Sequence, residues 1–318
     1  MIRKNINTET IEGRIYQHNL TEKKVENASS PNYGKTFING SIDVATDEAC
    51  LNVLNVHYTY VAATTKAGAQ NRTYATLKKI IESGKTILND GKDAATKVRL
   101  TPSAAVNDFY PNGGDELVTT PRNEGGYVTI INELAPEGIN RQKFKFDMLI
   151  TNVNHIDANE ERGIMNDYTQ ISGAIFSFKN DLIPFTVTAH NPSAMQYFEG
   201  LGVSNAEPVY TQIWGKIENR TVTKTQTVAS AFAGEDSELV DESERKVKEW
   251  VVTGANPESY DFGDENVMTV ADLQKAIEDR NVYLAEVKRR SDEYYASKGN
   301  AVATPAPANN IPEGGFKF

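Results

Sequence analysis

The stretch that decides the fold is FINGSIDVATDEACLNVLNVHYTYV, residues 37–61 of the 318-residue chain. Two runs in which apolar and polar residues alternate flank a short polar break, and this pattern predicts two paired β-strands. The first run contains the motif Ile38-x-Gly40-x-Ile42. The stretch therefore predicts a β-hairpin, whose outer face is either the plain surface of a barrel or a surface that binds a ligand.

The second half of the chain repeats this pattern. Ile171-x-Gly173-x-Ile175 corresponds to Ile38-x-Gly40-x-Ile42, and in each half a second strand, a short helix and a further strand follow. The helices are predicted at 73–83 and 193–201, and the strands after them at 96–101 and 209–217. The order strand, strand, strand, helix, strand, strand thus occurs twice. It is the order of a five-stranded Greek-key barrel, the OB-fold.

We therefore predict a mainly β protein with two OB-fold-like five-stranded Greek-key barrels, a C-terminal α-helix and a disordered tail. The predicted boundaries are 8–140 for the first barrel, 141–257 for the second, 258–298 for an acidic linker and the long helix, and 299–318 for the tail. Thr269 and Asp272 form a capping-box-like start for that helix. Its apolar residues keep an interrupted heptad spacing, which leaves two alternatives open: packing against its own domain, or a dimeric coiled coil.

The charge of the chain is concentrated in one segment. The formal net charge is −10, and residues 235–265 hold 11 acidic and 3 basic side chains. We interpret the acidic run 235–244 as a solvated linker. The remainder is close to neutral, so a local basic surface for phosphates is still compatible with the composition.

Several classes of protein are excluded or disfavoured by the sequence. The chain has no apolar run of about 18 residues and a polar N-terminus, so we expect no membrane helix, no signal peptide and a cytoplasmic location. Cys50 is the only cysteine, which excludes an intrachain disulfide and a cysteine-cluster zinc site. The four histidines lack metal-binding spacing, and neither a phosphate-binding loop nor a G-x-S-x-G elbow is present. We predict no enzymatic activity, no cofactor and no metal.

Strand alternation places aromatic and cationic side chains on the outer faces of both barrels. Exposed rings can stack on bases, at about 1–3 kcal/mol per base, while neighbouring cations meet phosphates. The alternative is that another domain, the 269–298 helix or a second subunit covers these rings. The residues we predict to contact nucleic acid are Arg14, Tyr16, Phe37, His57, Lys97, Arg99, Phe176, Phe178, Tyr210, Trp214, Lys216, Arg220 and Lys224.

The segments GKTFINGSIDVATDE and NVLNVHYTYV, the two-barrel layout and the tail together resemble single-stranded-DNA-binding proteins. The second half, with SGAIFSFKNDLIPFTVTAHN, YFEGLGVS, PVYTQIWGKI and VKEWVVTG, is similar to bacteriophage-encoded members. The resemblance implies sequence-tolerant coating and protection of single strands during phage replication or recombination, in the cytoplasm of the bacterial host. It also implies recruitment of replication or recombination proteins by the tail, here by Phe316 and Phe318. The chain ends in EGGFKF, so the acidic cluster usual before such a terminus is missing.

Two further hypotheses stay open at this point. A phage structural or host-interaction protein could use the same barrels as protein-docking modules, with the 269–298 helix forming a homo-oligomer. An OB-fold could also bind RNA or tRNA instead of DNA. The sequence does not separate these alternatives.

Overall fold

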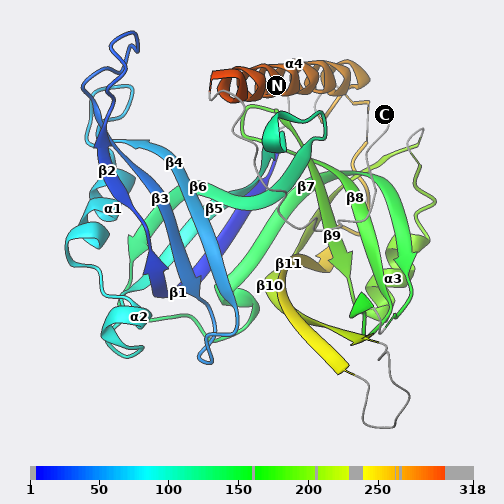
Figure 1. Ribbon diagram of the computed structural model, residues 1–318. Coiled ribbons are helices and arrows are strands. Elements are labelled where there is room, and N and C mark those ends of the chain that lie inside the picture. The colour runs from blue at the N-terminus through cyan, green and yellow to red at the C-terminus, as the bar shows by residue number, and fades with distance from the viewer. Residues whose placement is uncertain are drawn as a thin grey trace.

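The computed structural model describes residues 5–159, 162–204, 207–228, 239–261, 263–264 and 267–297, with the side chains of 220–245 left out. The predicted mainly β fold with a C-terminal helix is confirmed (Figure 1). The strands are β1 (Asn7–His18), β2 (Thr21–Lys24), β3 (Thr36–Ala45), β4 (Val53–Ala62), β5 (Lys97–Phe109), β6 (Val118–Ile130), β7 (Gln142–Ile156), β8 (Tyr168–Phe176), β9 (Leu182–Ala189), β10 (Val209–Val228) and β11 (Leu239–Ala255). The helices are α1 (Arg72–Ser83), α2 (Ile87–Asp90), α3 (Pro192–Glu199) and α4 (Val270–Ser297), with single 3-10 turns η1 (Pro111–Gly113) and η2 (Ile139–Arg141).

The strands pair into two closed circuits of five. In the first circuit β1 pairs with β3, β3 with β4, β4 with β6 in parallel, β6 with β5, and β5 again with β1. In the second circuit β7, β8, β9, β11 and β10 follow one another in the same way, with β9 and β11 parallel. Helices α1 and α3 come at the same place in each circuit, after the third strand. Each circuit therefore has the strand order of the predicted Greek-key barrel.

Strand β1 joins the two circuits into one sheet. Its first half, Asn7–Ile11, pairs with β7, while Ile11–Arg14 pairs with β5. Glu9 belongs to the half beside β7, and its carboxylate accepts a hydrogen bond of 2.7 Å from Trp250 Nε1 in β11. Burial raises the pKa of Glu9 to about 7. A single strand thus contributes Ile11 and Ile15 to the core and a buried carboxyl to the contact with β11.

The alternation read from the sequence explains why these strands form. In the opening stretch Ile38, Ile42, Leu54 and Val56 are fully buried, as the pattern predicts. Helix α1 begins after Asn71, whose side chain accepts hydrogen bonds from the backbone amides of the first turn, and its apolar face closes the same core. The core of the first circuit is continuous with that of the second.

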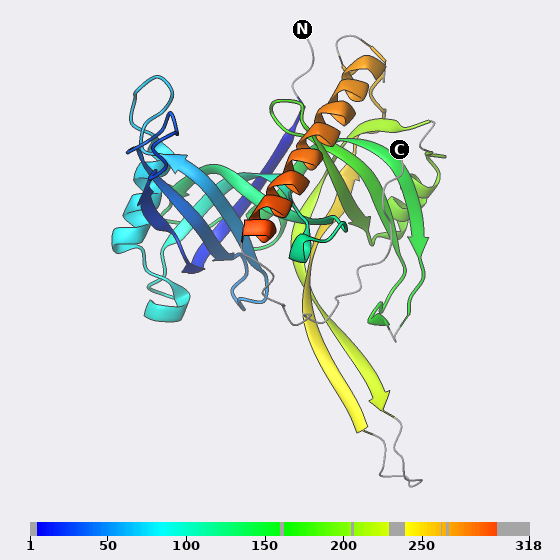
Figure 2. The ribbon, with the colours of Figure 1, turned by 45° about the horizontal axis from the view of Figure 1, so that its top comes forward.

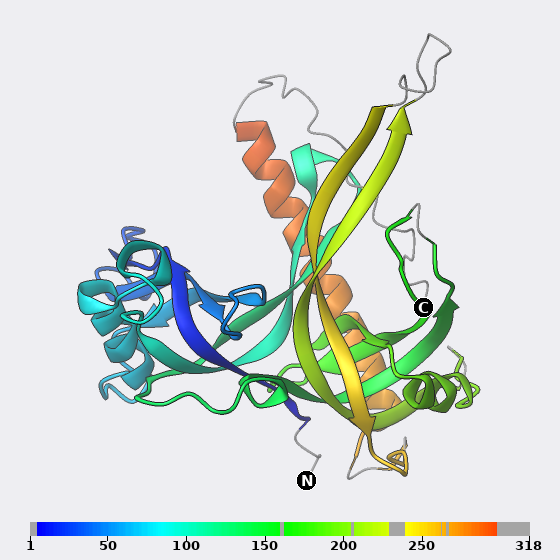
Figure 3. The ribbon, with the colours of Figure 1, turned by 90° about the horizontal axis from the view of Figure 1, so that it is seen from below.

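The interpretation of the acidic run as a linker is wrong where the structure describes it. Residues 239–255 form β11, which pairs with β10 from Val228 opposite Leu239 to Ile213 opposite Ala255. Figures 2 and 3 show that β10 and β11 extend beyond the circuit as a two-stranded ribbon. The backbone pairing with a strand rich in Thr and Val satisfies the peptide groups of this charged segment, and single-strand patterning does not reveal such a partner. Residues 235–238 lie outside the described residues.

Helix α4 packs against its own chain, which is one of the two alternatives for it. Thr269 and Asp272 form the predicted capping box. Leu273 and Ala276 pack on the second circuit, while Arg280 forms a bidentate ion pair of 2.7 and 2.8 Å with Asp108 of β5 in the first. The helix therefore fastens the two circuits to each other (Figure 2). Among the described residues, no helix is both long enough and apolar enough to cross a membrane.

Candidate nucleic-acid interface

Strands β6, β5, β1, β7 and β10 lie side by side and present one outer face across both circuits. Residues directly opposite each other in neighbouring strands share a face. Trp214 lies opposite Lys145, and Lys216 lies opposite Lys143. We call this surface the junction face and define it by Arg99, Tyr127, Lys143, Lys145, Trp214 and Lys216.

Trp214 is the best-placed ring on the junction face. Its side chain is 36% exposed, and its ring lies against the backbone of Gly254 in β11. A Cβ atom at position 254 would come within 2.5 Å of the indole, so this approach requires glycine. The indole therefore rests on a flat backbone seat and leaves part of its surface open for a second planar group.

Cationic side chains share the junction face with this ring. Lys143 and Lys145 are exposed, and within the part of the chain that the structure describes neither forms an ion pair. Lys216 pairs with Glu218 at 2.5 Å, and Arg99 pairs with the buried carboxylate of Glu12 at 2.6 Å. The two unpaired ammonium groups are thus the ones best suited to meet an anionic ligand beside Trp214.

A second aromatic surface lies at the start of β3 and the end of β4. The rings of Phe37 and Tyr60 stack with their centroids 4.7 Å apart and their planes 28° apart, and Tyr60 is 42% exposed. These rings and the exposed Lys23 and Lys24 of β2 line a shallow hollow. We call these four residues the β3–β4 platform.

The hollow beside this platform also contains carboxylates. Glu22 is engaged by the Tyr74 hydroxyl and by Lys78, and these hydrogen bonds lower the pKa of its carboxyl. Glu26 lines the hollow as well. Both carboxylates therefore line the hollow beside the two lysines, and that of Glu22 is already bound by Tyr74 and Lys78.

Of the predicted cations, Arg14 and Lys97 are committed to contacts within the protein. Arg14 pairs with Glu48 at 2.9 Å, and Arg141 and Lys92 bind the same carboxylate. Those partners, Lys92 first, hold the pKa of Glu48 at about 2. Lys97 donates to the carbonyl oxygen of Asn132 at 3.0 Å.

Two further predicted residues on the first circuit are only partly accessible. Tyr16 is half-buried in β1. His57 lies half-buried on the outer face of β4, and burial, followed by the nearby charge of Arg122, lowers its pKa. Since a lowered pKa favours the neutral imidazole, His57 adds little positive charge to this face.

The expected exposure of Phe176 and Tyr210 is wrong. Both side chains point away from the second core as the alternation predicts, but they are buried, at 0% and 1% exposure. Met268, just before α4, and Ala276 of α4 cover them together with Leu149 and Leu182. The covering helix, one of the alternatives left open by the sequence, therefore removes these two rings from the surface.

The remaining predicted residues divide into one exposed ring and four positions without described side chains. Phe178, in the turn between β8 and β9, is 76% exposed. The backbone of Arg220 and Lys224 belongs to β10, but their side chains lie outside the described residues. Phe316 and Phe318 lie entirely outside them.

The prediction missed Tyr60, Tyr127, Lys143 and Lys145. Strict alternation through the buried Leu54, Val56 and Tyr58 would direct Tyr60 inward, but a β-bulge inserts an extra residue in β4 before Val61 and turns Tyr60 outward. The lysines do carry a sequence signal, because KFKF at 143–146 alternates cation and ring. That pattern identifies both outward lysines once the strand is assigned.

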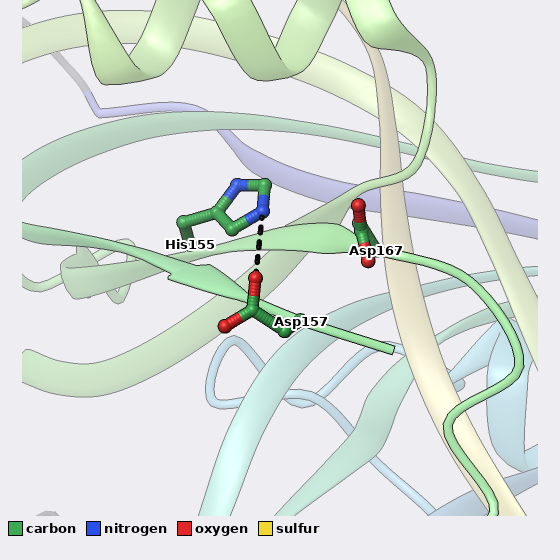
Figure 4. A group of neighbouring side chains, drawn as sticks. All are labelled: His155, Asp157 and Asp167. Carbon is green, nitrogen blue, oxygen red and sulfur yellow. Dashed lines mark ion pairs between the residues drawn. The ribbon is translucent and has the colours of Figure 1, made fainter. Parts of the chain in front are cut away.

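An exposed cluster of three side chains lies at the end of β7, and Figure 4 shows it. His155, Asp157 and Asp167 have atoms that could serve as ligands within 4.8 Å of one another. His155 pairs with Asp157 at 3.6 Å and with Glu199 at 2.9 Å, which raises the pKa of its imidazole. These mutual contacts account for the arrangement, and we assign no ion to it.

Comparisons with known proteins place the chain in a family. Residues 6–290 match the family model described as YorF, and this chain belongs to the YorF family. A search of curated proteins finds no match. Among solved structures, the wild-type single-stranded DNA binding protein from Thermus aquaticus is similar at 7% identity with a TM-score of 0.46, covering 81% of this chain and 96% of that one. A deletion mutant of that protein is similar at 8% identity with a TM-score of 0.46, covering 82% of this chain and 98% of that one.

Proposed function

We propose that this member of the YorF family binds single-stranded DNA through the junction face, without an enzymatic step and largely without sequence preference. The observation that carries the proposal is the indole of Trp214, seated on Gly254 and beside Lys143 and Lys145 of β7, which form no ion pair with any residue that the structure describes. A base stacks on the open part of the indole while the two ammonium groups meet phosphates. Every base has a π-face, so this contact tolerates any sequence.

The spacing of these groups suits an extended strand. Lys143 and Lys145 are alternate residues of one strand, so their Cα atoms lie roughly 6.6 Å apart, and Trp214 is about 5 Å across from Lys145. One ring therefore stands beside two cations that follow one another in the direction of β7. A single strand laid along this direction would place a base and its neighbouring phosphates on them together.

The finer parts of the proposal rest on the sequence resemblance. They are coating of strands in phage replication or recombination within the host cytoplasm, and recruitment of partner proteins by Phe316 and Phe318. A homo-oligomer formed through α4 is proposed from the interrupted heptad spacing of that helix. Phe178, Arg220 and Lys224 are proposed as additional DNA contacts. The proposed domains are the two units 8–140 and 141–257, followed by the segment 258–298 and the tail 299–318.

Titration with oligo-dT at low salt tests the proposal. We expect the fluorescence of Trp214 to be quenched, whereas Trp250, the only other tryptophan, is buried and should contribute a constant signal. Loss of one stacked base in Trp214→Ala should weaken binding about 5- to 150-fold, while Trp214→Phe should retain most of the affinity. The matched control is Tyr283→Ala, which removes an exposed ring from α4.

The cations are tested by the salt dependence of the affinity. For single strands, each phosphate neutralised by the protein adds about 0.7 to the slope of log K against log salt. Lys143→Gln and Lys145→Gln should therefore each reduce the slope by roughly 0.7. Unchanged tryptophan emission and electrophoretic mobility with excess oligo-dT would refute the proposal. Salt-insensitive capture of a protein would instead favour the docking-module alternative.

A further inference from the structure

We infer that one chain holds two single strands at the same time, one on the junction face and one on the β3–β4 platform, and so brings separate strands together. This inference rests on the proposed function of the junction face. Like the junction face, the β3–β4 platform combines accessible aromatic rings with neighbouring lysines. Two such surfaces on one chain raise the question of whether they form one path or two.

The two surfaces lie on different sides of the fold. The β3–β4 platform sits where β3 begins, beside the edge strand β2, whereas the junction face runs over β6, β5, β1, β7 and β10. β3 pairs with β1 only at its end, from Ile42 to Ala45, whereas Phe37 at its start pairs with β2 and β4, so the platform lies at the end of β3 that is away from β1. Figure 1 shows β2 and β3 at one end of the molecule and β7 and β10 toward the other. A strand lying flat on one surface does not reach the other.

The sheet between the two surfaces lacks cations that could guide a phosphate backbone. Asp43, at the end of β3, accepts hydrogen bonds from Gln17 and Asn55, and Glu124, beside β4, accepts from Thr59. Arg122 is held by this Glu124 at 2.8 Å. The outward side chains of β3 and β4 beyond the platform contain no Lys or Arg and are Asn39, Ser41, Asp43, Asn55, His57 and Thr59.

Charge therefore separates the surfaces. A continuous strand crossing this stretch would place phosphates over Asp43 and Glu124, whereas two separate strands would each lie beside the lysines of one surface without crossing these carboxylates. When the two strands are complementary, holding both on one chain raises the local concentration of each around the other and should speed their annealing.

Energy transfer between two labelled oligonucleotides tests the inference. Donor- and acceptor-labelled oligo-dT of the same short length are mixed with the full chain at one protein for every two strands. We expect energy transfer and a binding stoichiometry of two strands per chain. The double variant Phe37→Ala/Tyr60→Ala removes the rings of the β3–β4 platform, so it should bind one strand on the junction face and show no energy transfer. The double variant Trp214→Ala/Lys145→Gln disables the junction face, so it should bind one strand on the β3–β4 platform and show no energy transfer.

The two variants also control for folding and for association of chains. Each variant retains one binding surface, so binding of one oligonucleotide to that surface shows that the variant is folded. A mixture of both variants should not restore the transfer if one chain holds both strands. At protein concentrations at which the chain is a monomer, restored transfer in the mixture, transfer that survives in either variant, or a stoichiometry of one strand per wild-type chain would each overturn the inference. In the last case binding persists and the proposed function stands, whereas absence of any oligo-dT binding would remove both.

Discussion

Replacement of Glu9 should change how the stability of the protein depends on pH. The carboxyl is 2% exposed, and burial raises its pKa from an ordinary 4.5 to about 7. Between these two values the folded chain holds a proton on Glu9 that the unfolded chain has released. The free energy of unfolding should therefore fall by about 1.4 kcal/mol per pH unit across this window, and the whole loss is on the order of 3 kcal/mol.

The neighbouring charge does not alter the sign of this effect. Trp250 donates a hydrogen bond to the carboxylate and Lys248 attracts it, and both lower the pKa of Glu9 by less than burial raises it. Burial also lowers the pKa of Lys248 to about 8. The ordinary pKa of that ammonium is 10.5, so Lys248 changes the pH dependence of stability only between about pH 8 and 10.5. This range lies above the pH range in which Glu9 acts.

The assay is urea denaturation at several pH values between about 4.5 and 8, comparing wild type with Glu9→Gln. The variant should lose the part of the slope that Glu9 contributes, because glutamine has no proton to release while its carbonyl oxygen can still accept from Trp250. The slope is the informative quantity, because the new amide nitrogen replaces an oxygen that has no hydrogen-bond partner among the described residues. Glu207→Gln, on the surface, is the control and should keep the wild-type slope. A slope unchanged in Glu9→Gln would refute the reasoning.

Three further changes have expected outcomes. Gly254→Val should weaken oligo-dT binding in a filter assay without removing any contact residue, because the valine side chain would displace the ring of Trp214. Equal affinity would contradict the contact between Trp214 and Gly254. Arg280→Met leaves the carboxylate of Asp108 buried without its ion pair. The backbone amides of α4 should then exchange their hydrogens faster, because the helix loses on the order of 3 kcal/mol of protection. Unaltered exchange would show that the ion pair does not hold the helix. The pKa of Glu48, about 2 against an ordinary 4.5, makes a contribution that is present above pH 4.5 and is lost as the pH falls toward 2. Glu48→Gln should therefore flatten the acid limb of the stability curve measured by circular dichroism, and an identical acid limb would exclude this role.

Local patterns in the sequence predict much of the fold. The helix expected at 73–83 is α1, and the long helix expected from 269 is α4, because capping residues and apolar spacing act within a few residues of each other. The repeated motif around Gly40 and Gly173 lies in the second strand of each circuit. The alternation of Ile38 and Ile42, and of Ile171 and Ile175, follows from the two-residue period of a strand, so the sequence predicts that these residues face the core.

The candidate site is less predictable, because exposure depends on segments distant in the sequence. Alternation directs Tyr210 away from the second core, but α4 returns over it and buries it. Arg14 faces outward as expected, yet Glu48 lies close enough to hold its guanidinium. Tyr60 is turned outward by a bulge whose position depends on pairing with β3.

Local periodicity in the sequence therefore predicts most of the strands, their order and the face of most strand residues; the exceptions are the charged half of β11 and Tyr60, which depend on pairing with a distant strand. Only the tertiary structure decided which outward residues stay accessible and which meet one another. It placed Trp214 of β10 on Gly254 of β11 and opposite Lys145 of β7, three residues that are distant along the chain. Packing and pairing between distant segments set these contacts, and no short window of sequence contains them.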